Sequence, residues 1–127
     1  NWMLYHLPDL DRGLSEIARV LCPDGRLVAT TNSREHLREV WELVGREIAP
    51  LSFDAENGAT RLQQFFASVS RRDARAKVTF PSAAALRGYV GAFVSFTGES
   101  LSGRVPDLQE PFVAHALNSV FVADEPL

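Results

Sequence analysis

Hydrophobic positions repeat at helical spacing near the start of the sequence. From Leu10, apolar side chains fall at i, i+4, i+7, i+8 and i+11, which places them in one stripe along a helix. Asp9 or Asp11 can cap this helix at its start. Pro23-Asp24-Gly25 ends it, because proline cannot continue the hydrogen-bond ladder and glycine accepts the positive φ of a tight turn. The pattern predicts an amphipathic helix that lies on a sheet.

A short apolar run follows this turn. Residues 26–31 are mostly apolar and β-branched, which predicts a strand buried on both faces. Ser33 is then placed to cap a second helix, whose apolar positions repeat at steps of three and four residues until Pro50. Helix, tight turn, buried strand and helix in succession are typical of a doubly wound α/β sheet.

The second half of the chain predicts a more mixed succession of elements. Residues 69–80 combine β-branched side chains with charges, which suits an exposed strand or strand pair better than a buried parallel strand. Around it the pattern predicts a polar loop at 52–58, a short helix at 60–67, a helix opened by Pro81-Ser82, a linker-like loop at Thr97–Pro106, a last helix near 107–117 and a terminal strand at 119–123.

Composition narrows the function classes. The 127 residues, 46% hydrophobic with a net charge of -3, fit one ordinary globular domain. An acidic chain has no general attraction for phosphate backbones, and the charges of residues 71–77 lack interleaved aromatics, so we expect no nucleic-acid partner. No apolar run approaches the roughly 18 residues that a bilayer span needs. We therefore expect no membrane partner and a cytoplasmic location.

Familiar catalytic motifs are missing from the sequence. It contains no glycine-rich nucleotide loop, no H-E-x-x-H, no C-x-x-C and no G-x-S-x-G. His6, His36 and His115 are too widely spaced to form a local metal set, and the single cysteine, Cys22, cannot form an internal disulfide. We therefore expect no metal site.

The strongest local signal lies in the first 32 residues. The segments Asn1-Trp2-Met3-Leu4-Tyr5-His6-Leu7-Pro8-Asp9, Ser15-Glu16-Ile17-Ala18-Arg19-Val20-Leu21 and Pro23-Asp24-Gly25-Arg26-Leu27-Val28 together resemble class I S-adenosylmethionine-dependent methyltransferases. In that family they correspond to the exit from the fourth strand, the following helix, a Pro-x-Gly turn and the fifth strand. Later segments look like the family's carboxyl-terminal elements, including its antiparallel last strand: Glu56-Asn57-Gly58, Phe65-Phe66, the charged strand and Val120-Phe121-Val122.

The resemblance implies a partial domain. Residues 1–127 would form the carboxyl-terminal part of a Rossmann-like doubly wound sheet, from the loop after the fourth strand to the terminal strand. The apolar opening nonapeptide is unlike a frayed, polar terminus, so we expect the sequence to begin inside a longer protein. The family's glycine-rich loop and its ribose-binding acidic residue would lie in the missing amino-terminal half. We therefore expect this piece to be inactive by itself.

The resemblance also implies a site. Open α/β sheets bind ligands beyond the carboxyl ends of their strands. Asn1, Trp2 and Met3 would lie near the methionine portion of S-adenosylmethionine, and Thr31 and Asn32, with less support, would face the same crevice. His6 would be the catalytic residue, where it would shape the acceptor pocket or form a hydrogen bond in it. Equally, its ring could serve only to tie the loop to a backbone carbonyl.

Two function hypotheses follow. The first is methyl transfer to a small-molecule acceptor, favoured by the acidic charge and the lack of a nucleic-acid patch. The second is a non-catalytic α/β interaction or dimerisation module that self-associates through an exposed sheet edge.

Overall fold

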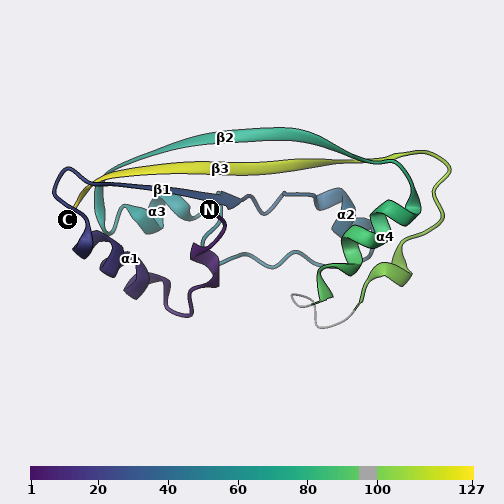
Figure 1. Ribbon diagram of the computed structural model, residues 1–127, viewed down its shortest axis with the longest axis horizontal. Coiled ribbons are helices and arrows are strands. Elements are labelled where there is room, and N and C mark those ends of the chain that lie inside the picture. Colours follow the sequence, from purple (N-terminus) through teal and green to yellow (C-terminus); the bar gives the residue numbers. More distant parts are fainter. Residues whose placement is uncertain (95–99) are drawn as a thin grey trace. The chain divides into compact units, whose positions relative to one another are not determined.

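The computed structural model describes residues 1–94 and 100–127. Its strands form one sheet in the order β1-β3-β2 (Figure 1). Contacts divide the chain into unit 1, which comprises residues 1–36, 49–75 and 117–127, and unit 2, which comprises residues 37–48 and 76–116. The elements are η1 (Leu4–His6), α1 (Leu10–Val20), β1 (Arg26–Asn32), α2 (Arg38–Leu43), α3 (Gly58–Leu62), β2 (Phe66–Phe80), α4 (Ala83–Gly91), η2 (Ser102–Arg104) and β3 (Phe112–Pro126).

The sheet of unit 1 is antiparallel where β1 meets β3. Ala29 pairs with Phe121, and Val28 pairs with Val122. This confirms the predicted antiparallel last strand. The prediction that β1 is buried on both faces is wrong: Ala29 is buried, but Val28 is 51% exposed. Side chains alternate across a strand, and α1 and α3 lie on the same side of the sheet (Figure 1), so only one face is covered by described residues.

Helix α1 forms as its sequence predicts. Asp9 is the N-cap, and its carboxylate accepts a hydrogen bond from the backbone N–H of Arg12 at 3.0 Å. The apolar stripe of the helix is buried against the covered face of the sheet. The core of unit 1 comprises Leu10, Leu14, Ala18, Ala29, Phe53, Leu62, Phe66, Phe121 and Ala123.

Gly58 opens α3 directly against Phe121. A Cβ atom at this position would lie 2.5 Å from Cε2 and 2.6 Å from Cζ of the Phe121 ring. Because that ring is fully buried, it cannot move aside cheaply. Gly58→Ala is therefore expected to lower the free energy of unfolding by about 1–3 kcal/mol, as overpacking does. Urea denaturation followed by circular dichroism measures it. Gly88→Ala is the control, since a Cβ there meets nothing within 4 Å; equal effects of the two substitutions would contradict the packing argument.

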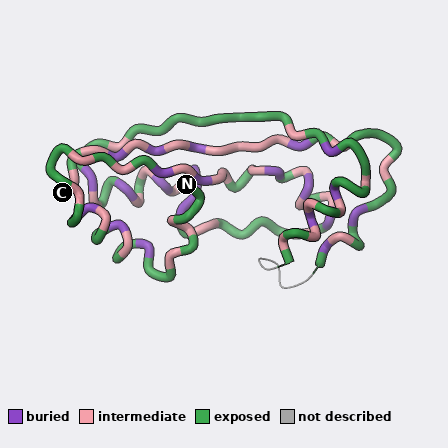
Figure 2. Tube along the Cα trace, viewed as in Figure 1, coloured by how far each residue is buried: buried purple, intermediate pink, exposed green. Residues whose placement is uncertain are grey.

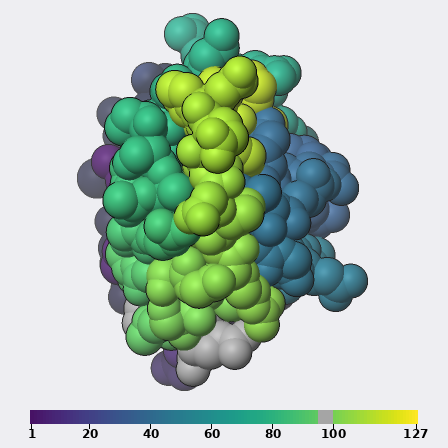
Figure 3. All heavy atoms as spheres, turned by 90° about the vertical axis from the view of Figure 1, so that its right-hand side faces the viewer, coloured from purple at the N-terminus to yellow at the C-terminus, as the bar shows by residue number. Residues whose placement is uncertain are grey.

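Unit 2 has its own core. It is built from α2, α4, η2 and the adjoining ends of β2 and β3, and Figure 3 shows the segment leading into β3 between α4 and the α2 region. Its buried residues are Leu37, Val40, Val44, Phe80, Leu86, Val90, Leu101, Val105 and Ala114. Helix α4 follows its predicted start, because the Ser82 hydroxyl accepts a hydrogen bond from the N–H of Ala85 at 3.2 Å.

Helix α2 is shorter than predicted. It spans Arg38–Leu43, and its N-cap is Leu37 in a left-handed conformation (φ 53°) with no side-chain cap. Ser33 does not cap it. The Ser33 hydroxyl instead donates to the Glu56 carboxylate and accepts from the N–H of Glu35. The hydroxyl of Ser33, which was predicted to cap this helix, thus forms hydrogen bonds within the loops after β1 and before α3.

The largest error in the predicted elements is the last helix. Residues 107–117 were expected to be helical, but β3 already begins at Phe112 and runs to Pro126, well beyond the predicted strand 119–123. Pro111 lies inside the expected helix, and proline disfavours helix in the residue before it. The β-propensity of Phe112 and Val113 then continues the strand.

Two other elements begin earlier than expected. Helix α3 covers Gly58–Leu62 in place of 60–67, and β2 starts at Phe66 in place of 69. The exposure predicted for the charged strand is confirmed, since Figure 2 shows β2 exposed along most of its length. Of the predicted loop at Thr97–Pro106, residues 97–99 lie outside the described residues. Among the described helices, none is long and apolar enough to cross a membrane.

Candidate functional site

The opening residues are bonded to the carboxyl end of β1. The backbone N–H of Trp2 donates to the carbonyl of Thr30 at 2.8 Å. The indole N–H of Trp2 donates to Oδ1 of Asn32 at 3.0 Å and to Oδ1 of Asn118 at 3.4 Å. The Thr30 hydroxyl donates to Oδ1 of Asn1 at 3.1 Å. We call Asn1, Trp2, Thr30, Asn32 and Asn118 the β1-end cluster.

The cluster holds Trp2 in an unusual conformation. Its φ is 50°, in the left-handed region that bulky residues rarely adopt. Such strain persists only where the surroundings fix it, and here backbone and indole are both hydrogen-bonded to neighbouring strands. Trp2 is nevertheless 42% exposed and Met3 64% exposed. The structure thus fixes the backbone at the strand end and leaves apolar side-chain surface exposed.

His6 follows in η1 close behind this cluster in sequence. Its backbone N–H donates to the carbonyl of Met3 at 2.9 Å, and its ring centroid lies 4.5 Å from that of Tyr5. Partial burial raises the pKa of the Tyr5 hydroxyl. The His6 ring is exposed.

Thr31 does not face the expected crevice. Its side chain is fully buried, and its hydroxyl donates to the carbonyl of Phe53 at 2.9 Å. Alternation explains the error: Thr31 shares the covered face with Ala29, whereas Thr30 and Asn32 lie on the other face with the indole of Trp2. Of the pair Thr31 and Asn32, the structure brings only Asn32 to the cluster.

A buried carboxylate organises the loop before α3. Asp54 is fully buried, and its oxygens accept from Nε of Arg34 at 2.8 Å and from the N–H groups of Glu56 and Asn57 at 3.0 and 2.8 Å. This organising role of Asp54 was not predicted from the sequence. An Asp that precedes a helical start by a few residues is a recognisable capping signal and could have predicted it.

A hollow of about 220 Å³ lies between β2, β3 and the end of β1, within unit 1. Ser33, Arg71, Asp73, Ala74, Arg75, Leu117, Asn118 and Ser119 line it. Hydrogen bonds from Arg71, and then from Ser119, hold the pKa of the Asp73 carboxyl below its usual value. Sequence reasoning treated these charges only as the exposed face of an edge strand.

His36 is the half-buried histidine near this region. Its Nδ1 accepts the backbone N–H of Leu117 at 3.0 Å, and burial lowers its pKa. A lowered folded-state pKa means that the unfolded chain binds the proton more readily. Stability is therefore expected to fall as pH drops below about 6.5, the ordinary histidine value.

His36→Asn tests this pH dependence. The amide oxygen can accept the same N–H but does not titrate. Histidine changes charge between about pH 7.5 and about pH 5. Over this range, urea denaturation should show a smaller decrease of the free energy of unfolding in the variant than in the unaltered chain. Identical slopes for the two proteins would contradict the assignment to His36.

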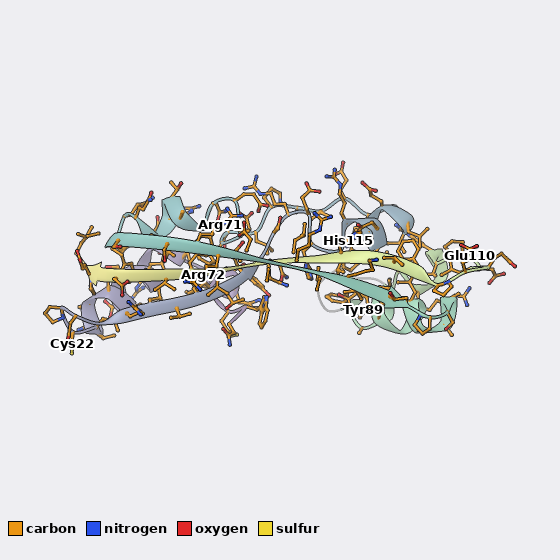
Figure 4. All side chains as sticks on the ribbon, turned by 90° about the horizontal axis from the view of Figure 1, so that it is seen from above. Cys22, Arg71, Arg72, Tyr89, Glu110 and His115 are labelled. Carbon is orange, nitrogen blue, oxygen red and sulfur yellow. The ribbon has the colours of Figure 1, made fainter. Side chains whose placement is uncertain are left out.

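The described residues offer no evident metal centre. No group of three or more His, Cys, Asp or Glu side chains among them could hold a metal ion. Cys22 is exposed (Figure 4).

Comparison with known proteins identifies the fold. No protein-family model matches the chain, and no curated protein does. Among solved structures, the chain is similar to a Bacillus halodurans protein that is provisionally assigned as a methyltransferase. The two are 14% identical with a TM-score of 0.54, over 98% of this chain and 61% of that one. The chain has a methyltransferase-like fold. It spans about three fifths of the length of this neighbour.

Proposed function

We propose that this chain is the carboxyl-terminal part of a class I S-adenosylmethionine-dependent methyltransferase domain, with the rest of a doubly wound sheet supplied by an amino-terminal half. The observation that carries the proposal is the bonding of Trp2 to the carboxyl end of β1. Ligands of open α/β sheets bind at that end. The methyltransferase-like fold and the antiparallel β3 support the same proposal.

The chemistry of the β1-end cluster fits the cofactor's methionine portion. Asn1 and Asn32 bring neutral amide groups, and Trp2 and Met3 bring exposed apolar surface. Neutral hydrogen-bonding groups suit an amino-acid zwitterion, and apolar surface suits the carbon chain and sulfur. Asn1, Trp2 and Met3 would hold this part of the cofactor. S-adenosylmethionine supplies an already activated methyl group, so the protein needs mainly to position the acceptor.

The remaining roles belong to the acceptor. Trp2 and Met3 would exclude water from one side of the bound acceptor, and the hydrogen bonds of Trp2 to Asn32 and Asn118 hold the indole in place for that role. His6 is exposed on the segment that follows, where its imidazole would accept the proton that an acceptor oxygen or nitrogen loses. The acceptor is a small molecule, in keeping with the acidic net charge of -3.

Two substitutions test these roles in a protein that joins this chain to an amino-terminal cofactor-binding half. Trp2→Ala should weaken S-adenosylhomocysteine binding by about tenfold, the loss expected for an apolar contact of one to two kcal/mol (about 1.4 kcal/mol per tenfold). Val20→Ala, which truncates an exposed apolar side chain on α1, should leave the affinity unchanged. His6→Asn should also leave it unchanged, because His6 serves the acceptor.

Calorimetry measures all three affinities. Equal affinity of the Trp2→Ala and Val20→Ala proteins would remove Trp2 from the cofactor site. A loss in His6→Asn as large as that in Trp2→Ala would place His6 in the cofactor site and contradict its role toward the acceptor.

A second candidate function rests on the edge of the sheet. β1 is an edge strand, and besides β3 its described backbone partners are Trp2 and Ala55, which bond Thr30 and Asn32. Unpaired edges favour pairing with another chain. A non-catalytic module that self-associates through β1 would sediment as a dimer, and Val28→Lys would return it to a monomer. A monomer at all concentrations would exclude this alternative.

A further inference from the structure

The hollow beside β2 shares only Asn118 with the β1-end cluster, and its Asp73–Ser119 bond lies on the face of the sheet opposite to Trp2. Its volume of about 220 Å³ is below the roughly 300–1,000 Å³ of sites that enclose drug-sized ligands. It therefore suits one small group of a molecule rather than a whole ligand. Arg71, Asp73 and Arg75 line it, and the bonds that each of them already makes decide which ligands it can bind.

Arg71 is already committed to neighbours. Its Nε donates to Oδ1 of Asp73 at 2.7 Å, and its Nη1 donates to the carbonyl of Ala55 at 2.6 Å. The guanidinium carbon also lies 6.0 Å from the ring centroid of Phe121. Arg71 is thus fixed in place and its charge is balanced by Asp73.

Asp73 is committed in the same way. Besides Arg71, its Oδ1 accepts the hydroxyl of Ser119 at 2.6 Å, and Ser119 is 1% exposed. Its Oδ1 therefore accepts from a guanidinium on its own strand and from a buried hydroxyl of β3. The negative charge of Asp73 is paired with Arg71, so the two side chains together add no net charge to the hollow.

Arg75 is the third charged side chain in the lining of the hollow. It lies two residues beyond Asp73 on β2, hence on the same face of the strand, and it lines the hollow. Among the ion pairs and hydrogen bonds of residues 1–94 and 100–127, none involves its guanidinium. With Arg71 and Asp73 cancelling, the lining carries one uncompensated positive charge. A guanidinium presents a planar fork of donors that matches a carboxylate or phosphate.

We propose that the hollow binds the anionic group of a small molecule, a carboxylate or a phosphate, through Arg75 against the fixed Arg71–Asp73–Ser119 arrangement. The ligand class is then a small acid or phosphate ester.

Nuclear magnetic resonance titration of this chain tests the site. Sodium acetate and sodium phosphate are added separately at constant ionic strength, kept with sodium chloride, and the backbone amides of Asp73 and Ser119 are followed. Saturable shifts are expected, and the tighter of the two salts identifies the kind of anionic group. Arg75→Gln should weaken binding by at least about tenfold, because it removes a charge-assisted pair.

Arg72→Gln is the matched control. Arg72 neighbours Arg71 on β2 (Figure 4) and lies three residues before Arg75. Because side chains alternate along a strand, the side chain of Arg72 lies on the face opposite to that of Arg75. This variant has the same net charge as Arg75→Gln and should bind like the unaltered chain. Equal weakening by both substitutions, shifts that do not saturate, or unchanged binding in Arg75→Gln would each overturn the site.

The two proposals can fail separately. Saturable anion binding by this chain, together with no S-adenosylhomocysteine binding by the longer protein, would keep the anion site and overturn the proposed function. Cofactor binding without saturable anion binding would keep the proposed function and overturn the hollow as a subsite.

Discussion

Phe121→Ala is expected to lower the free energy of unfolding by about 3–5 kcal/mol, as removal of a buried ring does. Phe121 is fully buried, and its ring meets that of Phe53 edge-on at a centroid distance of 5.6 Å. Gly58 and Arg71 pack against the same ring. Helix α3, the loop before it and β2 all converge there, so the cavity left by alanine could not be filled by a small movement of one element.

Urea denaturation, followed by circular dichroism, measures this loss. Val122→Ala is the matched control, since Val122 is the next residue on β3 and lies on the opposite, partly exposed face. It should cost no more than about 1 kcal/mol. A loss for Phe121→Ala as small as that of the control would show that Phe121 is not at the centre of the unit 1 core.

Asp54→Ala is expected to lower the free energy of unfolding by about 2–4 kcal/mol. The substitution leaves the N–H groups of Glu56 and Asn57 without their acceptor in a buried loop, and it leaves Arg34 without its carboxylate. Each orphaned buried donor costs about 1–3 kcal/mol, although Arg34 is partly exposed and can regain water. The anchor between the end of β1 and α3 would be lost.

The same denaturation experiment tests Asp54. Asp107→Ala is its control: Asp107 also pairs with an arginine, Arg87, but its side chain is 93% exposed. An exposed pair contributes about 0–1 kcal/mol. If both substitutions cost the same, the stabilisation attributed to Asp54 does not come from its burial and its network.

Local signals in the sequence predicted those elements whose ends are fixed by neighbouring residues. The Asp9 and Ser82 caps, and the turn before β1, define α1, α4 and β1 within a few residues. The predicted helix at 107–117 failed because Pro111 interrupts it and because β3, from Phe112 onwards, lies in the sheet beside β2. Such pairing joins residues far apart in sequence, and helical spacing alone does not reveal it.

The candidate site also combines residues that were predicted from the sequence with residues that only the pairing of distant strands brings together. The resemblance directed attention to Trp2 and Asn32, and both lie in the β1-end cluster. Asn118 was not expected there, because it arrives through the register that pairs it with Asn32. The hollow was missed for the same reason: Asp73 and Ser119 meet only once β2 and β3 are adjacent.

The central proposal is that this chain is one part of a methyltransferase domain, with cofactor binding completed by an amino-terminal half. Titration calorimetry with S-adenosylhomocysteine tests it most directly, on this chain and on a protein extended before Asn1. The account predicts no measurable heat of binding for the 127-residue chain and saturable one-to-one binding for the extended protein. Micromolar binding by the 127-residue chain alone, or no binding by the extended protein, would contradict it.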